Sequence, residues 1–412
     1  MLKRISYSII LNILSQGILF VVFLISAKLL GPAGRGVISA AVAMVTLMGT
    51  LAGFSIGRIT SHRIMESGKT AIEYYKDNFF NVFLLLLISI TLGFVSFAII
   101  QFAFPNTLGK INPISFWITF LSLPYFVWSS YSMYIFSNMD KIRVQNNIAL
   151  ICKLILLVVS TAYFFSKGLT ENIFLFSFSM VNLINFLCDQ VYLFKVLKYK
   201  LTISWLEVKG LFINGLKVHF DTIGYILYSS LLIVTLNANV DIDEVGLYNF
   251  SAQLISIIII IPTVTSQYIN TSCINSTPKL FWPQHKKILG LSLTIILIIC
   301  LLAYYLLPIL ISYLGLRFEK SIPFFNLLLL TVLPNSFATL MSPQWLTRGY
   351  FKSISAITLL AGISGYVSML IFVEDLKGYA AVLLNLVIYA IVAVANLFFY
   401  FKINAEGTKG CH

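Results

Sequence analysis

The chain has 412 residues, of which 59% are hydrophobic and only 10% are charged, and its mean hydropathy is +0.92. Soluble proteins carry about 25% charged residues, so this composition excludes a single soluble globular domain. The apolar residues come in blocks of about 18 or more, long enough as helices for the roughly 30 Å hydrocarbon core of a bilayer. The sequence therefore predicts an all-α integral membrane protein with many spans.

Twelve apolar blocks lie between polar breaks, and each predicts one transmembrane helix. The first block follows Lys3 and Arg4, as in a signal peptide, but its length of about 26 residues exceeds the apolar region of such a peptide. We therefore expect an uncleaved first span. The predicted spans are 5–30, 37–57, 79–102, 114–136, 148–165, 173–194, 211–237, 247–269, 288–312, 323–341, 353–373 and 379–401.

The net charge of +13 follows from membrane topology. An even number of spans places both termini on one side, and Lys and Arg concentrate in cytoplasmic loops. With both termini in the cytoplasm, the cytoplasmic segments hold 19 Lys and Arg, and the outward loops hold six. We therefore expect a multi-pass protein with cytoplasmic termini, and no nucleic acid as a partner.

The sequence contains no motif that indicates an enzyme, a cofactor or a metal site. The five cysteines are scattered without a CxxC pair, and no Walker, GxSxG or HExxH motif is present. Such motifs would supply the phosphate loop, nucleophile or zinc ligands that those chemistries require. We therefore expect neither catalytic residues nor a cofactor nor a metal.

A weak internal repeat divides the chain into halves. Residues 34–40 (GRGVISA) and 246–252 (GLYNFSA) share Gly, Ser and Ala at an offset of 212, which also carries the first span onto the seventh. Parallel repeats of this kind are a known transporter architecture. We expect two six-helix bundles, residues 1–200 and 201–412, joined by a cytoplasmic connection around 195–210 that contains Trp205.

Residues 29–36 (LLGPAGRG) and 245–248 (VGLY) resemble signatures of polysaccharide-transport flippases, the Wzx-type O-antigen translocases of the MOP superfamily. The length, the twelve spans and the cytoplasmic termini agree with that family along the whole chain. The resemblance implies two parallel bundles around a central cavity in the bacterial inner membrane.

The same resemblance implies a function in the biosynthesis of lipopolysaccharide or a related surface polysaccharide. The flippase would move undecaprenyl-pyrophosphate-linked O-antigen repeat units from the cytoplasmic to the periplasmic leaflet by alternating access. Its partners would be this lipid-linked oligosaccharide, membrane lipids and other polysaccharide assembly proteins.

Two other functions stay open. One is a cation-coupled drug or metabolite antiporter of the same superfamily, which the flippase-like turn and the few intramembrane acids disfavour. The other is a membrane polysaccharide polymerase, which would need a large outward loop, whereas the longest outward loop here is about residues 103–113.

Span seven carries the main candidate site. At 100° per residue, Asn214, Lys217, Asp221, Tyr225 and Tyr228 fall on one face, which we expect to line a cavity. Lys217, Tyr225 and Tyr228 would bind substrate, with Lys217 attracting the pyrophosphate, and Asp221 would couple transport to an ion. Alternatively, Lys217 and Asp221, four residues apart, form a salt bridge that makes the helix insertable.

Three further ionisable positions are candidates. Asp189 in span six would couple an ion, or else capture solvent or pair with Lys153 of span five. Lys153 would bind substrate, or else reach the cytoplasmic interface. Arg58 would bind substrate at the cytoplasmic entry. Alternatively, it is only one of the Lys and Arg residues that concentrate in cytoplasmic loops.

Span one adds a polar face with Asn12 and Gln16. These side chains would suit sugar hydroxyls, although helix–helix hydrogen bonding is the commoner use of such residues.

Overall fold

The computed structural model describes residues 2–103, 112–166, 168–198, 200, 202–276, 278–314 and 316–408. Within these ranges the side chains of Asn12, Arg58, Lys217 and Asp221, among others, lie outside the described residues. All regular structure in the described part is helical. The chain divides into two compact units, Met1–Ala238 and Asn239–His412.

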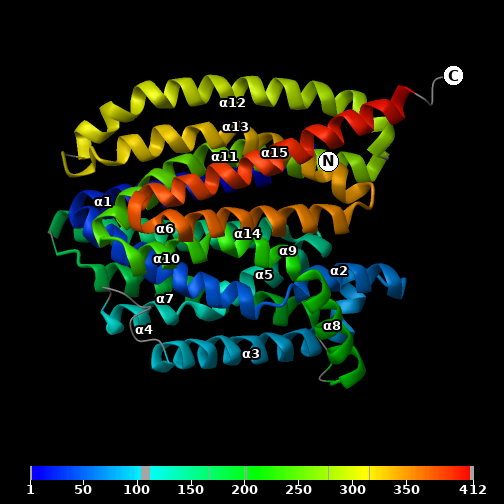
Figure 1. The fold of residues 1–412 in the computed structure, drawn as a ribbon. Helices are drawn as coiled ribbons and strands as arrows, with labels where there is room; N and C mark the ends of the chain where they lie inside the picture. Colours follow the sequence, from blue (N-terminus) through cyan, green and yellow to red (C-terminus); the bar gives the residue numbers. More distant parts are fainter. Residues whose placement is uncertain are drawn as a thin grey trace. The chain divides into compact units, whose positions relative to one another are not determined.

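The first unit contains all the short α-helices of the described chain and also its longest helix, the kinked α1 (Figure 1). In chain order they are α1 (Leu2–Ala52), α2 (Ile56–Ser67), α3 (Ala71–Ala103), α4 (Pro113–Phe120), α5 (Leu123–Asn138), α6 (Ile142–Ser166), α7 (Glu171–Leu197), α8 (Trp205–Val218), α9 (Phe220–Tyr228) and α10 (Ser230–Asn239).

The second unit is built from long helices joined by short connections. They are α11 (Ile242–Ser276), α12 (Pro278–Leu314), the short 3₁₀ turn Leu316–Phe318, α13 (Ser321–Thr347), α14 (Phe351–Leu376) and α15 (Gly378–Thr408).

A kink, and not a loop, joins the first two predicted spans. Gly31 has φ 69° and ψ −172° inside α1, a conformation that a residue with a Cβ rarely adopts, and Pro32 follows it at a position where its missing N–H does no harm. Arg35, which falls between the predicted spans 5–30 and 37–57, is buried beside this kink. Its Nη1 donates to Ser26 Oγ at 3.1 Å, and its guanidinium lies 4.7 Å from the centroid of the Phe23 ring.

Two further predicted spans consist of consecutive shorter helices. The block 114–136 divides into α4 and α5, and the block 211–237 divides into α8, α9 and α10. The second division falls at His219, which keeps a helical φ of −74° and ψ of −14°, and at Ser229, whose φ of −111° and ψ of −95° are not helical. A helical-wheel projection of span seven therefore cannot extend past Ser229, which follows all five residues of the predicted face.

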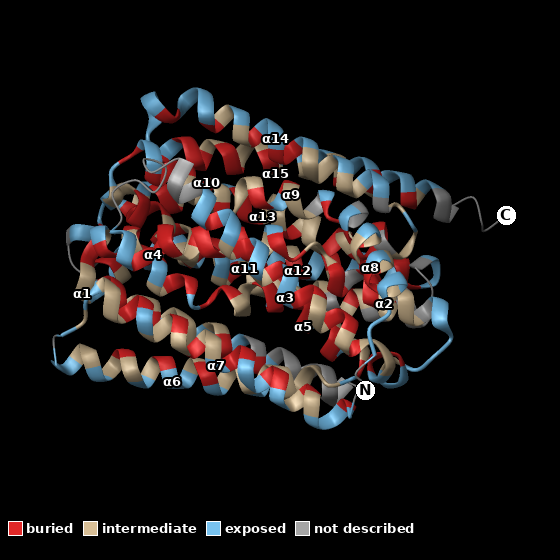
Figure 2. Ribbon diagram, turned by 90° about the horizontal axis from the view of Figure 1, so that it is seen from below, coloured by how far each residue is buried: buried red, intermediate tan, exposed pale blue. Residues whose placement is uncertain are grey.

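The described residues include ten helices that are long and apolar enough to cross a membrane. Large apolar side chains also remain exposed along one side of α6, with exposed fractions of 58% for Ile151, 67% for Val158 and 79% for Phe165 (Figure 2). Lipid tails are the solvent that such a surface suits. The chain is thus an all-α multi-pass integral membrane protein, while the count of twelve spans stays a prediction.

Small residues let α1 and α2 approach α5 closely. A Cβ at Gly49 would lie 2.6 Å from Phe126 Cβ, and one at Gly57 would lie 2.6 Å from the carbonyl oxygen of Ser130. Between these glycines the chain turns through two left-handed residues, Phe54 (φ 46°) and Ser55 (φ 53°). This turn ends α1, starts α2 and directs Ser55 toward α8 and α9.

Polar contacts hold the connection between α7 and α8 against α3. Lys200 Nζ lies 3.0 Å from Asp77 Oδ1, and Asn81 Oδ1 accepts from the backbone N–H of Ser204 at 2.9 Å. Asp77 also pairs with Lys69 at 2.8 Å, and this contact raises the pKa of Lys69 above its usual value. The bundle boundary expected near residue 200 rests on the internal repeat and stays a prediction.

In the second unit, Trp and Tyr side chains form hydrogen bonds with the side-chain amides of buried Asn residues on neighbouring helices. Trp345 on α13 donates its indole N–H to Asn396 Oδ1 on α15 at 2.8 Å, and its ring stacks on Phe399 at a centroid distance of 3.7 Å. Asn385 on α15 donates to the hydroxyl of Tyr248 on α11 at 2.9 Å. Such pairs satisfy polar groups that burial would otherwise leave without partners.

Candidate functional site

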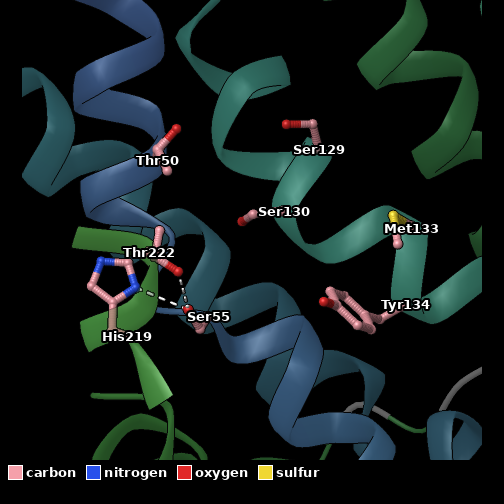
Figure 3. Close-up of a pocket in the computed structure, with 8 residues that line it drawn as sticks. All are labelled: Thr50, Ser55, Ser129, Ser130, Met133, Tyr134, His219 and Thr222. Atoms are coloured by element: carbon pink, nitrogen blue, oxygen red, sulfur yellow. Dashed lines mark hydrogen bonds between the residues drawn. The ribbon is translucent and has the colours of Figure 1, made fainter. Parts of the chain in front are cut away.

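A pocket of about 200 Å³ in the first unit gathers hydroxyl groups from three parts of the chain (Figure 3). One wall comes from α1 and the turn after it, a second from α5, and a third from the start of α9. The described lining residues are Thr50, Ser55, Ser129, Ser130, Met133, Tyr134, His219 and Thr222.

Ser55 and His219 join two of these walls. Ser55 Oγ lies 3.0 Å from His219 Nδ1 and 3.2 Å from Thr222 Oγ1. His219 is buried, and its ring leans against Phe54 at a centroid distance of 6.0 Å. Gly215 makes the approach possible, because a Cβ there would lie 2.6 Å from the Phe54 carbonyl oxygen.

The hydroxyls of the other two walls are oriented by their own helices. Thr50 Oγ1 donates to Thr46 O at 2.7 Å, Ser129 Oγ donates to Phe126 O at 2.8 Å, and Ser130 Oγ donates to Val127 O at 2.8 Å. The hydroxyl of Tyr134 points toward the side of the pocket that holds Ser55 (Figure 3).

Three of the predicted site residues lie next to lining residues along the chain. Lys217 precedes His219 by two residues, Asp221 directly precedes Thr222, and Arg58 follows Ser55 by three. Their side chains lie outside the described residues, so the alternative of a Lys217–Asp221 salt bridge stays open.

The remaining predicted substrate contacts lie outside the described lining of the pocket. Tyr225 has an exposed fraction of 54%, and Tyr228 is half-buried. Their rings meet edge to face at 5.2 Å. Gln16 is half-buried on α1, and the side chain of Asn12 is outside the described residues.

Asp189 is buried on α7, and its partner is an aromatic side chain and not a cation. Trp128 on α5 donates its indole N–H to Asp189 Oδ2 at 2.9 Å, while Oδ1 has no hydrogen-bond partner among the described residues. Lys153 is half-buried on α6 and forms no ion pair with any described residue. The expected Asp189–Lys153 pairing is therefore absent from the described contacts.

The sequence did not single out Trp128 or most of the pocket. The consecutive Ser129 and Ser130 within an apolar block are the one local signal for it. Ser55 and His219 are 164 positions apart, so no periodicity could bring them together. Among the described residues, no group of three or more His, Cys, Asp or Glu could hold a metal ion.

Residues 1–268 match the family model described as polysaccharide biosynthesis protein. The chain belongs to this family. The family resemblance predicted from residues 29–36 and 245–248 is thereby confirmed at the level of this polysaccharide biosynthesis family. Comparison with curated protein sequences finds no match.

Solved structures of MOP transporters share the fold. An inward-facing multidrug resistance MATE family transporter matches with a TM-score of 0.69 at 14% identity, over 96% of each chain. The lipid II flippase MurJ, in an inward closed conformation, matches with a TM-score of 0.67 at 13% identity, over 98% of this chain and 90% of that one. An outward-facing MATE family transporter matches with a TM-score of 0.60 at 12% identity, over 98% and 96%. This polysaccharide biosynthesis family member therefore has a MATE-like fold.

Proposed function

We propose that this chain is a flippase that moves undecaprenyl-pyrophosphate-linked repeat units of O-antigen, or of a related surface polysaccharide, from the cytoplasmic to the periplasmic leaflet by alternating access. The observation that carries the proposal is a hydroxyl-lined pocket within helices whose outer surfaces are apolar. Family membership supports the polysaccharide pathway.

The physical need for such a pocket is strong. A pyrophosphate and its sugars cannot cross the roughly 30 Å hydrocarbon core without a polar route, because no group in lipid replaces their hydration. Charged residues within spans are expensive and typically mark such routes. Lys217 and Arg58, next to the pocket along the chain, are the cations we propose for the diphosphate, with Lys153 as a third.

The remaining candidates complete this site. Tyr225 and Tyr228 would contact the glycan as it moves, and Asn12 and Gln16 would bind sugar hydroxyls from span one. Asp221 and Asp189 are the proposed ion-coupling groups. Asp189 suits proton exchange because it is buried and its Oδ1 has no described partner, so Trp128 is the one described donor that stabilises the charged form.

The topology belongs to the same proposal. Twelve spans follow if the kinked α1 counts twice and if α4 with α5 forms one span. The 19-to-6 distribution of Lys and Arg supports cytoplasmic termini, in the inner membrane, for two parallel six-helix bundles around a central cavity. Reporter fusions after Lys69, Lys141, Lys200, Lys286 and Lys352 would then read cytoplasmic, and fusions near residues 110, 243 and 374 would read periplasmic. An inverted signal at Lys200 would contradict the six-plus-six arrangement.

The function itself is tested by removing the protein from its cell and measuring where the lipid-linked glycan accumulates. A flippase predicts intact repeat units on the cytoplasmic face and a loss of glycan exposed to the periplasm. Unchanged glycan exposure together with altered efflux of cationic drugs would favour the antiporter, the alternative that the fold likeness to MATE transporters supports.

A further inference from the structure

We propose that the pocket lined by Thr50, Ser55, Ser129, Ser130, Tyr134 and Thr222 binds a neutral sugar ring through the sugar's own hydroxyl protons, and that the diphosphate lies outside it. This inference rests on the proposed flippase function and specifies which part of the substrate the pocket takes.

Three of the lining hydroxyl groups already donate their protons within the protein. A hydroxyl has one proton and two lone pairs. Thr50, Ser129 and Ser130 each donate that proton to a backbone carbonyl of their own helix, at 2.7, 2.8 and 2.8 Å. Each can therefore offer a ligand only lone pairs, so this side of the pocket consists of hydrogen-bond acceptors.

The opposite side adds few donors. Ser55 bonds with His219 and with Thr222, and these two bonds use two of the three polar hydrogens that the neutral side chains carry. Tyr134 is the one lining hydroxyl that has no hydrogen-bond partner among the described residues. The pocket thus presents more acceptors than donors to its contents.

This polarity discriminates between the two parts of a lipid-linked glycan. The oxygens of an ionised diphosphate are acceptors only, so in this pocket they would face other lone pairs, and the described lining includes no Lys or Arg. Sugar hydroxyls supply the protons that the acceptors lack. A metal or ammonium ion would find no carboxylate among the described lining residues to balance its charge.

The volume of the pocket indicates how much of the glycan enters. At about 200 Å³ it is smaller than the roughly 300–1,000 Å³ of sites that hold drug-sized molecules. One sugar ring fits this volume better than an oligosaccharide with its carrier. The pocket would therefore read a single sugar, while the diphosphate binds at the cations nearby along the chain.

The experiment removes hydrogen-bond acceptor oxygens from the pocket lining by substitutions that keep the side chains close to their original shape. In the variant Thr50→Val/Ser129→Ala, two acceptor oxygens are lost. Its matched control is Thr46→Val/Ser256→Ala, because Thr46 and Ser256 also donate to backbone carbonyls, at 2.8 and 2.7 Å, but do not belong to the described pocket lining. Each double variant loses two hydrogen bonds from a side-chain hydroxyl to a backbone carbonyl of its own helix, but only the first changes the described pocket lining.

Affinity is measured for purified protein in lipid nanodiscs with two kinds of probe. One is undecaprenyl pyrophosphate without sugar, and the other is undecaprenyl pyrophosphate linked to N-acetylglucosamine or to galactose. We expect the wild-type protein to bind a sugar-bearing probe more tightly than the sugar-free probe. In the pocket variant this ratio of affinities should fall about tenfold, because two hydrogen bonds to the sugar are lost. Binding of the sugar-free probe should be unchanged, which also shows that the variant is folded, and the control variant should match wild type.

Three results would overturn the inference while leaving the flippase function standing. In the first, the pocket variant binds the sugar-free and the sugar-bearing probes more weakly by the same factor. In the second, the variant keeps the sugar preference of the wild type. In the third, the wild-type protein binds all the probes with equal affinity. Wild-type protein that binds none of the probes would overturn the flippase function and, with it, this inference.

Discussion

Trp128 on α5 donates its indole N–H to the carboxylate oxygen Oδ2 of Asp189 on α7 over 2.9 Å, and both side chains are buried. The two residues are 61 positions apart, so the bond fixes one helix against another. A buried carboxylate with one described donor depends strongly on that donor, because the desolvated oxygen has no water to replace it.

Replacing Trp128 with Phe should therefore destabilise the protein by about 1–3 kcal/mol, the penalty for a buried polar group that loses its partner. The double variant Trp128→Phe/Asp189→Leu should regain part of this loss, since both polar partners are then absent. Thermal unfolding in detergent measures both. Equal unfolding temperatures for wild type and Trp128→Phe would show that the bond contributes nothing.

If Asp189 exchanges a proton during transport, Asp189→Asn should abolish the dependence of flipping on a pH gradient. The amide cannot ionise, but its oxygen can still accept from Trp128. Glycan flipping is compared in proteoliposomes with and without the gradient. A variant that flips faster with the gradient, as wild type would, excludes Asp189 as the coupling group and leaves Asp221.

The close approach of α2 to α5 predicts a large effect of a single methyl group. In Gly57→Ala the new Cβ would lie 2.6 Å from Ser130 O and 2.8 Å from Tyr131 Cα, and both are backbone atoms that cannot turn aside. We expect a loss of about 1–3 kcal/mol from overpacking. Gly17→Ala is the control, because no atom lies within 4 Å of its Cβ position, and it should be neutral or slightly stabilising. Similar thermal unfolding of the two variants would contradict this packing.

In the second unit, Tyr248→Phe should lower stability by about 0.5–1.5 kcal/mol, the net value of one hydrogen bond. The loss is modest because Asn385, which donates to the Tyr248 hydroxyl, also donates to Ala381 O at 2.9 Å. Tyr304→Phe serves as the control, since Tyr304 is 48% exposed and has no described hydrogen bond. Unfolding temperatures of the two variants should differ, with Tyr248→Phe the lower.

Lys217→Gln keeps length and polarity but deletes the positive charge. Flipping of lipid-linked repeat units should fall by about tenfold or more, because a charged donor contributes about 1.5–3 kcal/mol to binding an anion. Lys209→Gln, at an exposed position of the same helix, should leave flipping unchanged. Full activity of Lys217→Gln at normal expression would remove Lys217 from the mechanism and leave Lys153 or Arg58.

The sequence by itself determined the class of the protein and the placement of its helices. The apolar blocks all fall on helical structure, with the first two sharing the kinked α1, because a lipid-exposed segment must satisfy its own backbone hydrogen bonds within one stretch of chain. That requirement is local, so it can be inferred from the order of residues. The short signatures around residues 29–36 and 245–248 were likewise sufficient for the family.

Only the tertiary structure decided which side chains meet. The projection of span seven assumed an unbroken helix along the whole block, whereas Ser229 leaves the helical conformation, so the projection cannot extend past that residue. The pairing of Ser55 with His219 depends on a left-handed turn and on the missing side chain of Gly215, and neither leaves a periodic pattern. Contacts between distant positions arise from helix packing, whose geometry is set by the shapes of both partners together.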